Sequence, residues 1–231
     1  MTATVRLNEA SGHNPGWKMN LNGQLVEGDW DVTSRFGSVE TAVVLDPSGK
    51  PVFDRPLYRE SPNVNVVAWG RTAAGELRLA VISQPRPHAD DPEQPGVNGH
   101  KPVVFGQIVM GFVKTIIGES FEDAAGREAA QEAGASIVKS VERPDYPWHN
   151  PNPTFVATWS DLLFLEIDLE RVEALRPSRT EPIYKAEFIS VPELLRRIRV
   201  GKDADGAVYR MCTANSAWMI FFACHPELFV S

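Results

Sequence analysis

Cysteine, histidine and long apolar runs are all scarce in this chain, and each shortage excludes a class of protein. Its 231 residues include two cysteines, Cys212 and Cys224, without the C-x-x-C spacing of a zinc site or the density of a disulfide framework. The apolar stretches at 103–113 and 216–224 are too short to cross a bilayer, and residues 1–15 lack the basic and then apolar order of a signal peptide. We therefore expect a cytoplasmic protein with reduced thiols and no membrane contact.

Positive charge is also in short supply. The chain has 23 Lys and Arg against 30 Asp and Glu, a formal net charge of −7, and its basic residues form no stripe. Proteins that coat nucleic acids present such stripes to displace condensed counterions, so we expect no nucleic-acid partner. The five histidines lack metal-ligand spacing, and no G-x-S-x-G motif offers a serine nucleophile. An acidic protein can still act on an anionic substrate if divalent cations or a few arginines screen the charges.

Strand patterns alternate with helix patterns along most of the chain, which favours the α/β class. Turn residues inside 36–54, and between 63–71 and 76–83, predict two hairpins. Residues 84–102, rich in Pro, Gly and charge, predict a long surface loop. Further segments have the composition of strands, at 103–113, 136–143, 154–168 and 182–191, and of helices, at 120–133, 191–202 and 213–228.

One predicted helix has clear capping signals and carries two glutamates on one face. Ser120 and Asp123 form a capping box, and Gly134 is a typical C-terminal stop. Glu128 and Glu132 are four residues apart, so their carboxylates project from the same face of the helix. Like charges at this spacing destabilise a helix unless a cation lies between them, and Mg²⁺, which prefers oxygen ligands, is the natural candidate.

Two neighbouring residues extend this cluster. Glu119, just before the helix, could join the same cation. Arg127 lies on the helix one position before Glu128. We therefore expect it to face elsewhere and to brace the preceding loop through carboxylate or carbonyl contacts. The alternative is an alanine-rich surface helix whose charges lie on its solvated face.

The segment GESFEDAAGREAAQEAGA resembles the Nudix box, the signature of the Nudix hydrolase superfamily. In that pattern a glutamate is followed, after seven residues, by Arg-Glu, an aliphatic residue, a Glu pair and a final glycine. The matching positions are Glu119, Arg127, Glu128, Ala129, Glu132, Gly134 and Ala135. Gln131 departs from the pattern by replacing the first glutamate of the pair, and the loop GFVKTIIGE is about two residues longer than usual. Gln131 can offer a neutral carbonyl oxygen to a cation, but it cannot act as a base.

The resemblance implies a fold and an assembly. Residues 61–231 would form the Nudix fold, a mixed β-sheet sandwiched between helices. Residues 1–60 would form a β-rich arm through which such enzymes pair as homodimers, with Trp30 or Phe36 placed to stack on a base.

The resemblance also implies a mechanism. Mg²⁺, or Mn²⁺ in its place, would be held by Glu128, Glu132 and Glu119, with Gln131 beside them, and Arg127 would support these ligands. The metal ions would bridge a pyrophosphate, neutralise its charge and lower the pKa of an attacking water.

A base outside the box would then accept the proton. In members that hydrolyse ADP-ribose this base lies on a late loop, and the similar stretch here is RPSRTEPIYKAEF, so Glu181 is the candidate. It could equally be a loop carboxylate in water. Asp168, Glu170 and Glu173 could be ordinary solvated charges.

The strand ending in AVISQPRP is similar to one in ADP-ribose-type members. That similarity implies that Arg86 contacts the diphosphate or the terminal ribose through its bidentate fork, the alternative being a loop arginine in solvent. In the Pro-rich segment 144–153, Tyr146 and Trp148 could stack on a base or sugar, or could anchor the loop to the core. His149 is a weaker candidate for the base.

Together these features predict the Mg²⁺-dependent hydrolysis of the diphosphate linkage in a nucleoside diphosphate derivative. ADP-ribose or a nucleotide sugar is the favoured substrate. One alternative, motivated by Gln131 and the lengthened loop, is a catalytically weakened module that binds a nucleotide. Another alternative is a biosynthetic diphosphate hydrolase, which the unusual segment 84–102 would suit.

Overall fold

The chain divides into two compact units, residues 1–62 with 150–159, and residues 63–149 with 160–231. A computed structural model describes residues 4–7, 18–21, 24–27, 33–34, 37–45, 47–48, 50–90, 102–147, 156–157, 160–175 and 183–229. None of the helices within these ranges is both long enough and apolar enough to cross a membrane.

The first unit is built from strands. Its described residues form a five-stranded sheet and a separate strand pair, and the segments are β1 (Thr4–Leu7), β2 (Lys18–Leu21), β3 (Gln24–Glu27), β4 (Thr33–Ser34), β5 (Gly37–Leu45), β6 (Pro51–Glu60) and β12 (Val156–Ala157). β5 and β6 pair antiparallel, so the hairpin predicted over 36–54 is confirmed. β12 pairs in parallel with β6, which brings a late segment of the chain into this unit.

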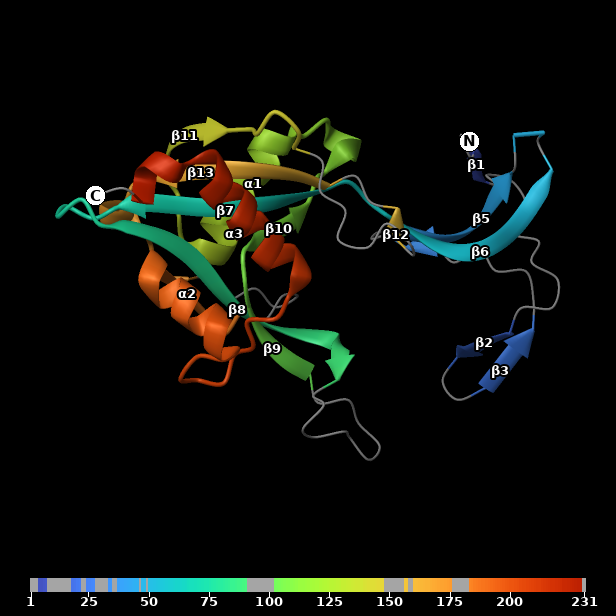
Figure 1. Ribbon diagram of the computed structural model, residues 1–231. Coiled ribbons are helices and arrows are strands. Elements are labelled where there is room, and N and C mark those ends of the chain that lie inside the picture. Colours follow the sequence, from blue (N-terminus) through green and yellow to red (C-terminus); the bar gives the residue numbers. More distant parts are fainter. Residues whose placement is uncertain are drawn as a thin grey trace. The chain divides into compact units, whose positions relative to one another are not determined.

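The second unit contains a mixed sheet that has seven strands in the described part of the chain (Figure 1). They are β7 (Asn63–Arg71), β8 (Leu77–Asp90), β9 (Pro102–Gln107), β10 (Val109–Phe112), β11 (Val138–Glu142), β13 (Ser160–Ile167) and β14 (Lys185–Ser190). β13 runs parallel to β7, whereas β8 and β10 run antiparallel to it. The structure is therefore of the mixed α/β class.

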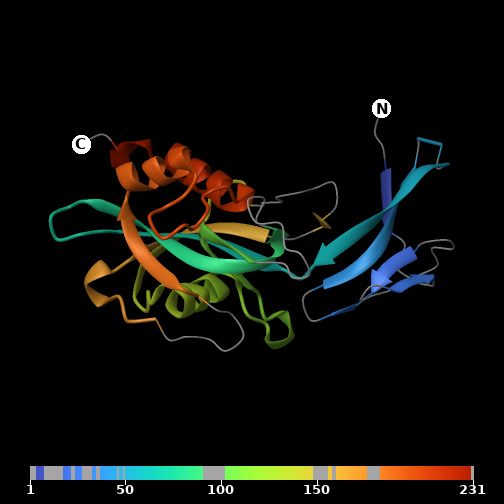
Figure 2. The same cartoon turned by 90° about the horizontal axis from the view of Figure 1, so that it is seen from below.

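Helices cover both faces of this sheet. The α-helices are α1 (Phe121–Ala133), α2 (Val191–Val200) and α3 (Cys212–Cys224), and the short 3-10 turns are η1 (Thr115–Ile117), η2 (Leu169–Arg171) and η3 (Pro226–Phe229). Because side chains alternate along a strand, Ala80 and Ile82 of β8 pack in the cluster that includes α1, whereas Leu79 and Val81 pack against α2 and α3. Figure 2 shows the sheet between these two layers.

β8 is longer than the sequence predicted, and the expectation of a surface loop over all of 84–102 is wrong. The strand continues to Asp90, and Pro85 and Arg86 lie opposite Val104 and Val103 of β9. Proline cannot donate a backbone hydrogen bond, so it is tolerated where a strand has one edge without a partner. In the described residues the pairing of β14 with β8 ends at Ser83, and Pro85 lies just beyond that point.

A single chain segment links two parts of the sheet. β9 pairs with β8, and β10, which follows after Ile108, pairs with the first half of β7 instead. The second half of β7 pairs with β8. The segment 102–112 therefore crosses from one strand to the other, and its β10 part lies against α1.

A buried arginine joins α2 to the sheet and to the segment that follows the helix. Arg197 is 9% exposed, and its Nε donates to Glu193 at 2.7 Å. Its Nη1 contacts Glu187 on β14 and donates to the Tyr209 hydroxyl at 2.8 Å. Gly106 makes room for the tyrosine, because a Cβ atom at this position would overlap the ring.

Burial of Tyr209 gives the fold a specific sensitivity to alkali. Removal of the side chain from water raises the pKa of Tyr209 to about 12, from an ordinary value of 10. A raised pKa in the folded state contributes stability that is fully present below pH 10 and is lost as the pH rises towards 12. We expect the free energy of unfolding to fall more steeply across this window in the natural protein than in Tyr209→Phe, measured by urea denaturation at successive pH values. The pKa of Lys185 is also raised, but Lys185 is present in both proteins and contributes to both slopes. Equal slopes would therefore contradict the assignment to Tyr209.

Candidate functional site

The predicted caps place α1. Ser120 is the N-cap residue: its Oγ accepts a hydrogen bond from the Asp123 backbone N–H at 3.0 Å and donates to the Asp123 carboxylate at 2.7 Å. Gly134 ends the helix in the left-handed conformation, at φ 67°. Both signals found in the sequence are confirmed, and they mark the two ends of α1.

Glu128 and Glu132 both lie against the sheet. Their exposed fractions are 6% and 2%, far below those usual for charged side chains. Glu132 Oε2 accepts the backbone N–H of Met110 on β10 at 3.0 Å. Gly111 makes room for Glu128, because a Cβ atom there would overlap the carboxylate. The two glutamates are therefore built into the contact between α1 and β10.

Arg127 ties the loop before α1 to the helix. Its Nε and Nη2 donate to the two oxygens of Glu119, at 2.7 and 3.0 Å, and Nη2 also donates to the Phe112 carbonyl at 2.8 Å. These hydrogen bonds lower the pKa of Glu119 below its ordinary value, and the Glu119 carboxylate raises that of Arg127. The loop between β10 and α1 is held at both ends, since Glu119 Oε2 also accepts the Lys114 N–H at 2.7 Å.

One expectation about Arg127 is wrong. Its position beside Glu128 predicted that the two side chains face apart, but Nη1 contacts Glu128 Oε1. The arginine side chain is long enough to fold back along the helix and reach the neighbouring carboxylate. Arg127 therefore offsets part of the repulsion between the buried glutamates.

The remaining predicted metal ligands differ in their surroundings. Gln131 is exposed, and its Oε1 accepts a hydrogen bond from Arg127 at 3.3 Å. Both oxygens of Glu119 accept hydrogen bonds from Arg127 or Lys114. Among the described residues, no three His, Cys, Asp or Glu side chains gather closely enough to hold a metal ion.

The Glu128–Glu132 pair nevertheless fits Mg²⁺. This cation is commonly bound by one or two carboxylates, with waters and substrate phosphates completing its octahedral shell. Two carboxylates on consecutive turns of one helix supply the oxygen ligands that such a site requires from the protein.

Several predicted residues lie outside the described part of the chain: Glu181, Trp148, His149, Trp30 and Phe36. Tyr146 is described, and it is 75% exposed. Asp168 caps η2 by accepting the Glu170 N–H at 3.1 Å, which gives this acidic residue a local structural role.

Two buried glutamines were not predicted. Gln84 and Gln107 are 5% and 0% exposed and lie on β8 and β9. Gln107 Nε2 donates to Gln84 Oε1 at 2.7 Å, and Arg86 Nε donates to Gln107 Oε1 at 2.9 Å. Gln84 is two residues beyond Ile82, so it faces the side of the sheet that α1 covers. Extending the alternation of Ala80 and Ile82 by one step would have found it.

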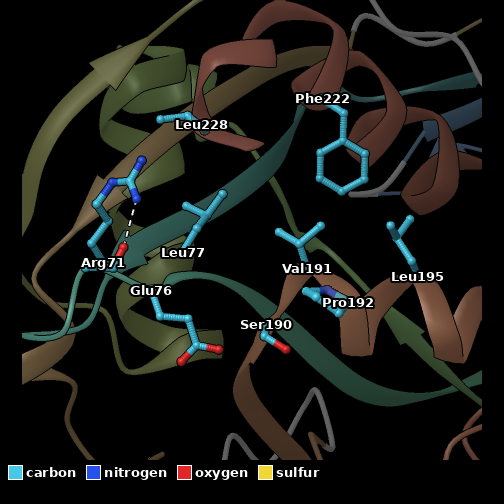
Figure 3. Close-up of a pocket in the computed structure, with 10 residues that line it drawn as sticks. Arg71, Glu76, Leu77, Ser190, Val191, Pro192, Leu195, Phe222 and Leu228 are labelled. Atoms are coloured by element: carbon cyan, nitrogen blue, oxygen red, sulfur yellow. Dashed lines mark hydrogen bonds between the residues drawn. The ribbon is translucent and has the colours of Figure 1, made fainter. Parts of the chain in front are cut away.

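A groove of about 520 Å³ lies on the opposite side of the sheet (Figure 3). It is lined by Arg71, Gly75, Glu76, Leu77, Ser190, Val191, Pro192, Leu195, Phe222 and Leu228. Val191, Phe222 and Leu228 pack in the cluster that belongs to α2 and α3. The groove therefore contains none of the predicted site residues.

Comparison of the sequence with models of protein families and with curated proteins finds no match.

Proposed function

We propose that this protein is an Mg²⁺-dependent hydrolase of the Nudix type and that its second unit has the Nudix fold. The observation that supports this most directly is the buried pair Glu128 and Glu132, which lies against β10. Arg127 offsets part of the cost of burying two like charges one turn apart, and a bound divalent cation would offset more of it.

Each residue of the cluster has a role in this proposal. Glu128 and Glu132 would hold Mg²⁺, and Mn²⁺ suits the same oxygen ligands. The bound cation would neutralise phosphate charge and lower the pKa of a water molecule. Arg127 and Glu119 position Glu128 and the loop that precedes α1. Glu181 remains the candidate for the base.

The proposed substrate is a nucleoside diphosphate derivative, with ADP-ribose or a nucleotide sugar favoured. Arg86 supports this choice, because it lies in the second half of β8 with its guanidinium bonded to a residue on the face that α1 covers. A guanidinium binds phosphate oxygens in a bidentate manner. Tyr146 and Trp148 remain candidates for stacking on the base or sugar.

The test is phosphate release, coupled to a phosphatase, from nucleoside diphosphate sugars, dinucleotides and nucleoside triphosphates, with Mg²⁺, with Mn²⁺ and without metal. We expect metal-dependent turnover that is fastest with ADP-ribose or a nucleotide sugar. Silence across the panel, together with thermal stabilisation by a nucleotide, would reject the hydrolase and favour a binding module.

The binding module is the second candidate, and the environment of Gln131 is the observation that favours it. The carbonyl of this residue bonds to Arg127, so the helix offers two buried carboxylates, fewer than the family pattern has. Gln131→Glu separates the two functions. A large rise in turnover from almost nothing would identify the natural protein as a binder, whereas a small change from substantial turnover would identify a hydrolase.

Gly111→Ala tests whether the placement of Glu128 matters for turnover. The added Cβ would overlap the Glu128 carboxylate, so the side chain must move. Misplacing a catalytic group by about 1 Å costs on the order of 100-fold in rate, and we expect kcat/KM to fall by at least about tenfold. Gly126→Ala in α1 is the matched control, because a Cβ there meets nothing within 4 Å. Equal activity of the two variants would contradict the role of Glu128.

A further inference from the structure

The groove on the α2 and α3 side of the sheet has apolar side chains along its length and a cation at one end. Leu77, Val191, Leu195 and Phe222 belong to its apolar lining. Figure 3 shows Arg71 at one end and Phe222 at the other, with Leu77 and Val191 between them. A volume of about 520 Å³ is typical of small-molecule sites, which combine an apolar lining with a few polar groups.

The charge at one end of the groove comes from Arg71. Its Nη1 donates to the backbone carbonyl of Gly75 at 2.8 Å, and a carbonyl oxygen carries no charge to compensate the guanidinium. Within the described ranges of the chain, no carboxylate forms an ion pair with Arg71. Glu76, the acidic residue of the groove, is instead paired with Arg78 at 2.8 Å. This end of the groove therefore has a single positive charge in excess.

This charge distribution favours a ligand with an apolar body and one negative charge. A carboxylate can accept two parallel hydrogen bonds from a guanidinium. A doubly charged phosphate would exceed the compensating charge and would be repelled by Glu76, which lines the same groove. An aliphatic chain would cover the side of Leu195, which is 47% exposed, and would remove apolar surface from water.

We propose that the groove binds an aliphatic carboxylate, with the carboxylate on Arg71 and the chain lying over Leu77 and Val191 towards Phe222. The site lies on the face of the sheet opposite α1, and it shares no residue with the Glu128–Glu132 pair. The inference is therefore independent of the proposed hydrolase function, and its test requires no turnover.

The experiment measures the affinity of the full chain for octanoate, decanoate and octan-1-ol by isothermal titration calorimetry. We expect each of the two methylenes added in decanoate to tighten binding by up to about fourfold, because more apolar surface is buried. Octan-1-ol has the same chain length as octanoate but no charge, so it should bind about tenfold more weakly. Absence of saturable binding of decanoate would overturn the proposal, as would equal affinity for octanoate and octan-1-ol.

Arg71→Met tests the charged end of the groove. It should weaken the binding of octanoate about tenfold and that of octan-1-ol by less than about twofold, since only the carboxylate interacts with the guanidinium. Arg196→Met is the matched control, because Arg196 is an exposed arginine of α2 that lies outside the groove lining. If Arg71→Met and Arg196→Met bound octanoate equally well, Arg71 would not be the recognition group and the proposal would fail.

Leu195→Gln tests the apolar end. The exposed position tolerates a polar side chain without loss of the fold, and we expect octanoate and octan-1-ol to bind about fourfold more weakly, as for the loss of one buried methylene. Met219→Gln is the control, because Met219 is 64% exposed on α3 and lies outside the groove lining. Equal weakening by both variants would place the ligand elsewhere. If sedimentation showed a dimer that Leu195→Gln converts to a monomer, a second copy of the chain would cover the groove, and the proposal would be overturned.

Discussion

Replacing Glu132 with glutamine is expected to lower Mg²⁺-dependent turnover by about 100-fold or more, which corresponds to roughly 3 kcal/mol of lost transition-state stabilisation. Glutamine has nearly the same shape and keeps an oxygen that can accept the Met110 N–H, so the variant should fold. What it loses is the negative charge that a divalent cation requires. The measurement is kcat/KM with the preferred substrate over a range of Mg²⁺ concentrations.

Glu122→Gln is the matched control, because Glu122 belongs to the same helix and is exposed in its first turn. It removes an equal charge from α1 without touching the pair that faces β10, and turnover should stay near that of the natural protein. If Glu132→Gln retained full metal-dependent activity, the catalytic cation would have to bind elsewhere.

Arg197→Met is expected to destabilise the second unit by about 3–5 kcal/mol, the usual cost of removing one partner from a buried ionic cluster. The substitution removes the guanidinium from Glu187, which keeps its ion pair with Lys185 at 3.1 Å, and it removes the Arg197 donor from the buried Tyr209 hydroxyl. Asp203, whose side chain is 3% exposed, loses an ion pair at 3.5 Å. For a protein of this size the corresponding fall in Tm is about 6–20 °C.

Arg196→Met provides the comparison one residue away. Arg196 is exposed, and its bonds run to Glu193 on the surface of α2. Exposed ion pairs of this kind contribute little to stability, so the Tm of Arg196→Met should stay close to that of the natural protein. Similar Tm values for Arg197→Met and Arg196→Met would show that the buried cluster is not what stabilises α2. Calorimetry of both proteins under the same buffer conditions makes the comparison direct.

The helix at the proposed site could be predicted in detail because its signals are local. The side chain and backbone of Ser120 and Asp123 bond within a single turn, and Gly134 supplies the backbone conformation that ends the helix. The spacing of Glu128 and Glu132 then places both on one face by helix geometry alone. The antiparallel pairing of β5 with β6, and of β7 with β8, follows from turn residues for the same reason.

The features that could not be predicted depend on residues distant in sequence. Gln107 reads as a polar residue at a strand end, and only its pairing opposite Ile82 places it in the interior. Arg197 reads as one of several charges on an amphipathic helix, and its burial follows from partners on β14 and beyond α2. The sequence did not predict the strand pairing of Pro85, because proline is usually taken as a sign of a loop.

The crossing of segment 102–112 from β8 to β7 constrains how the chain can vary in length. Gln107 supports Arg86, whereas Met110 and Gly111, a few residues later, receive Glu132 and Glu128. Side chains alternate between the two faces of a sheet. Inserting or deleting one residue between 107 and 110 would therefore turn either Gln107 or the pair Met110 and Gly111 towards the wrong face. No single compensating substitution could restore both. Proteins related to this one should therefore keep the length of this short stretch constant even where surrounding loops grow or shrink.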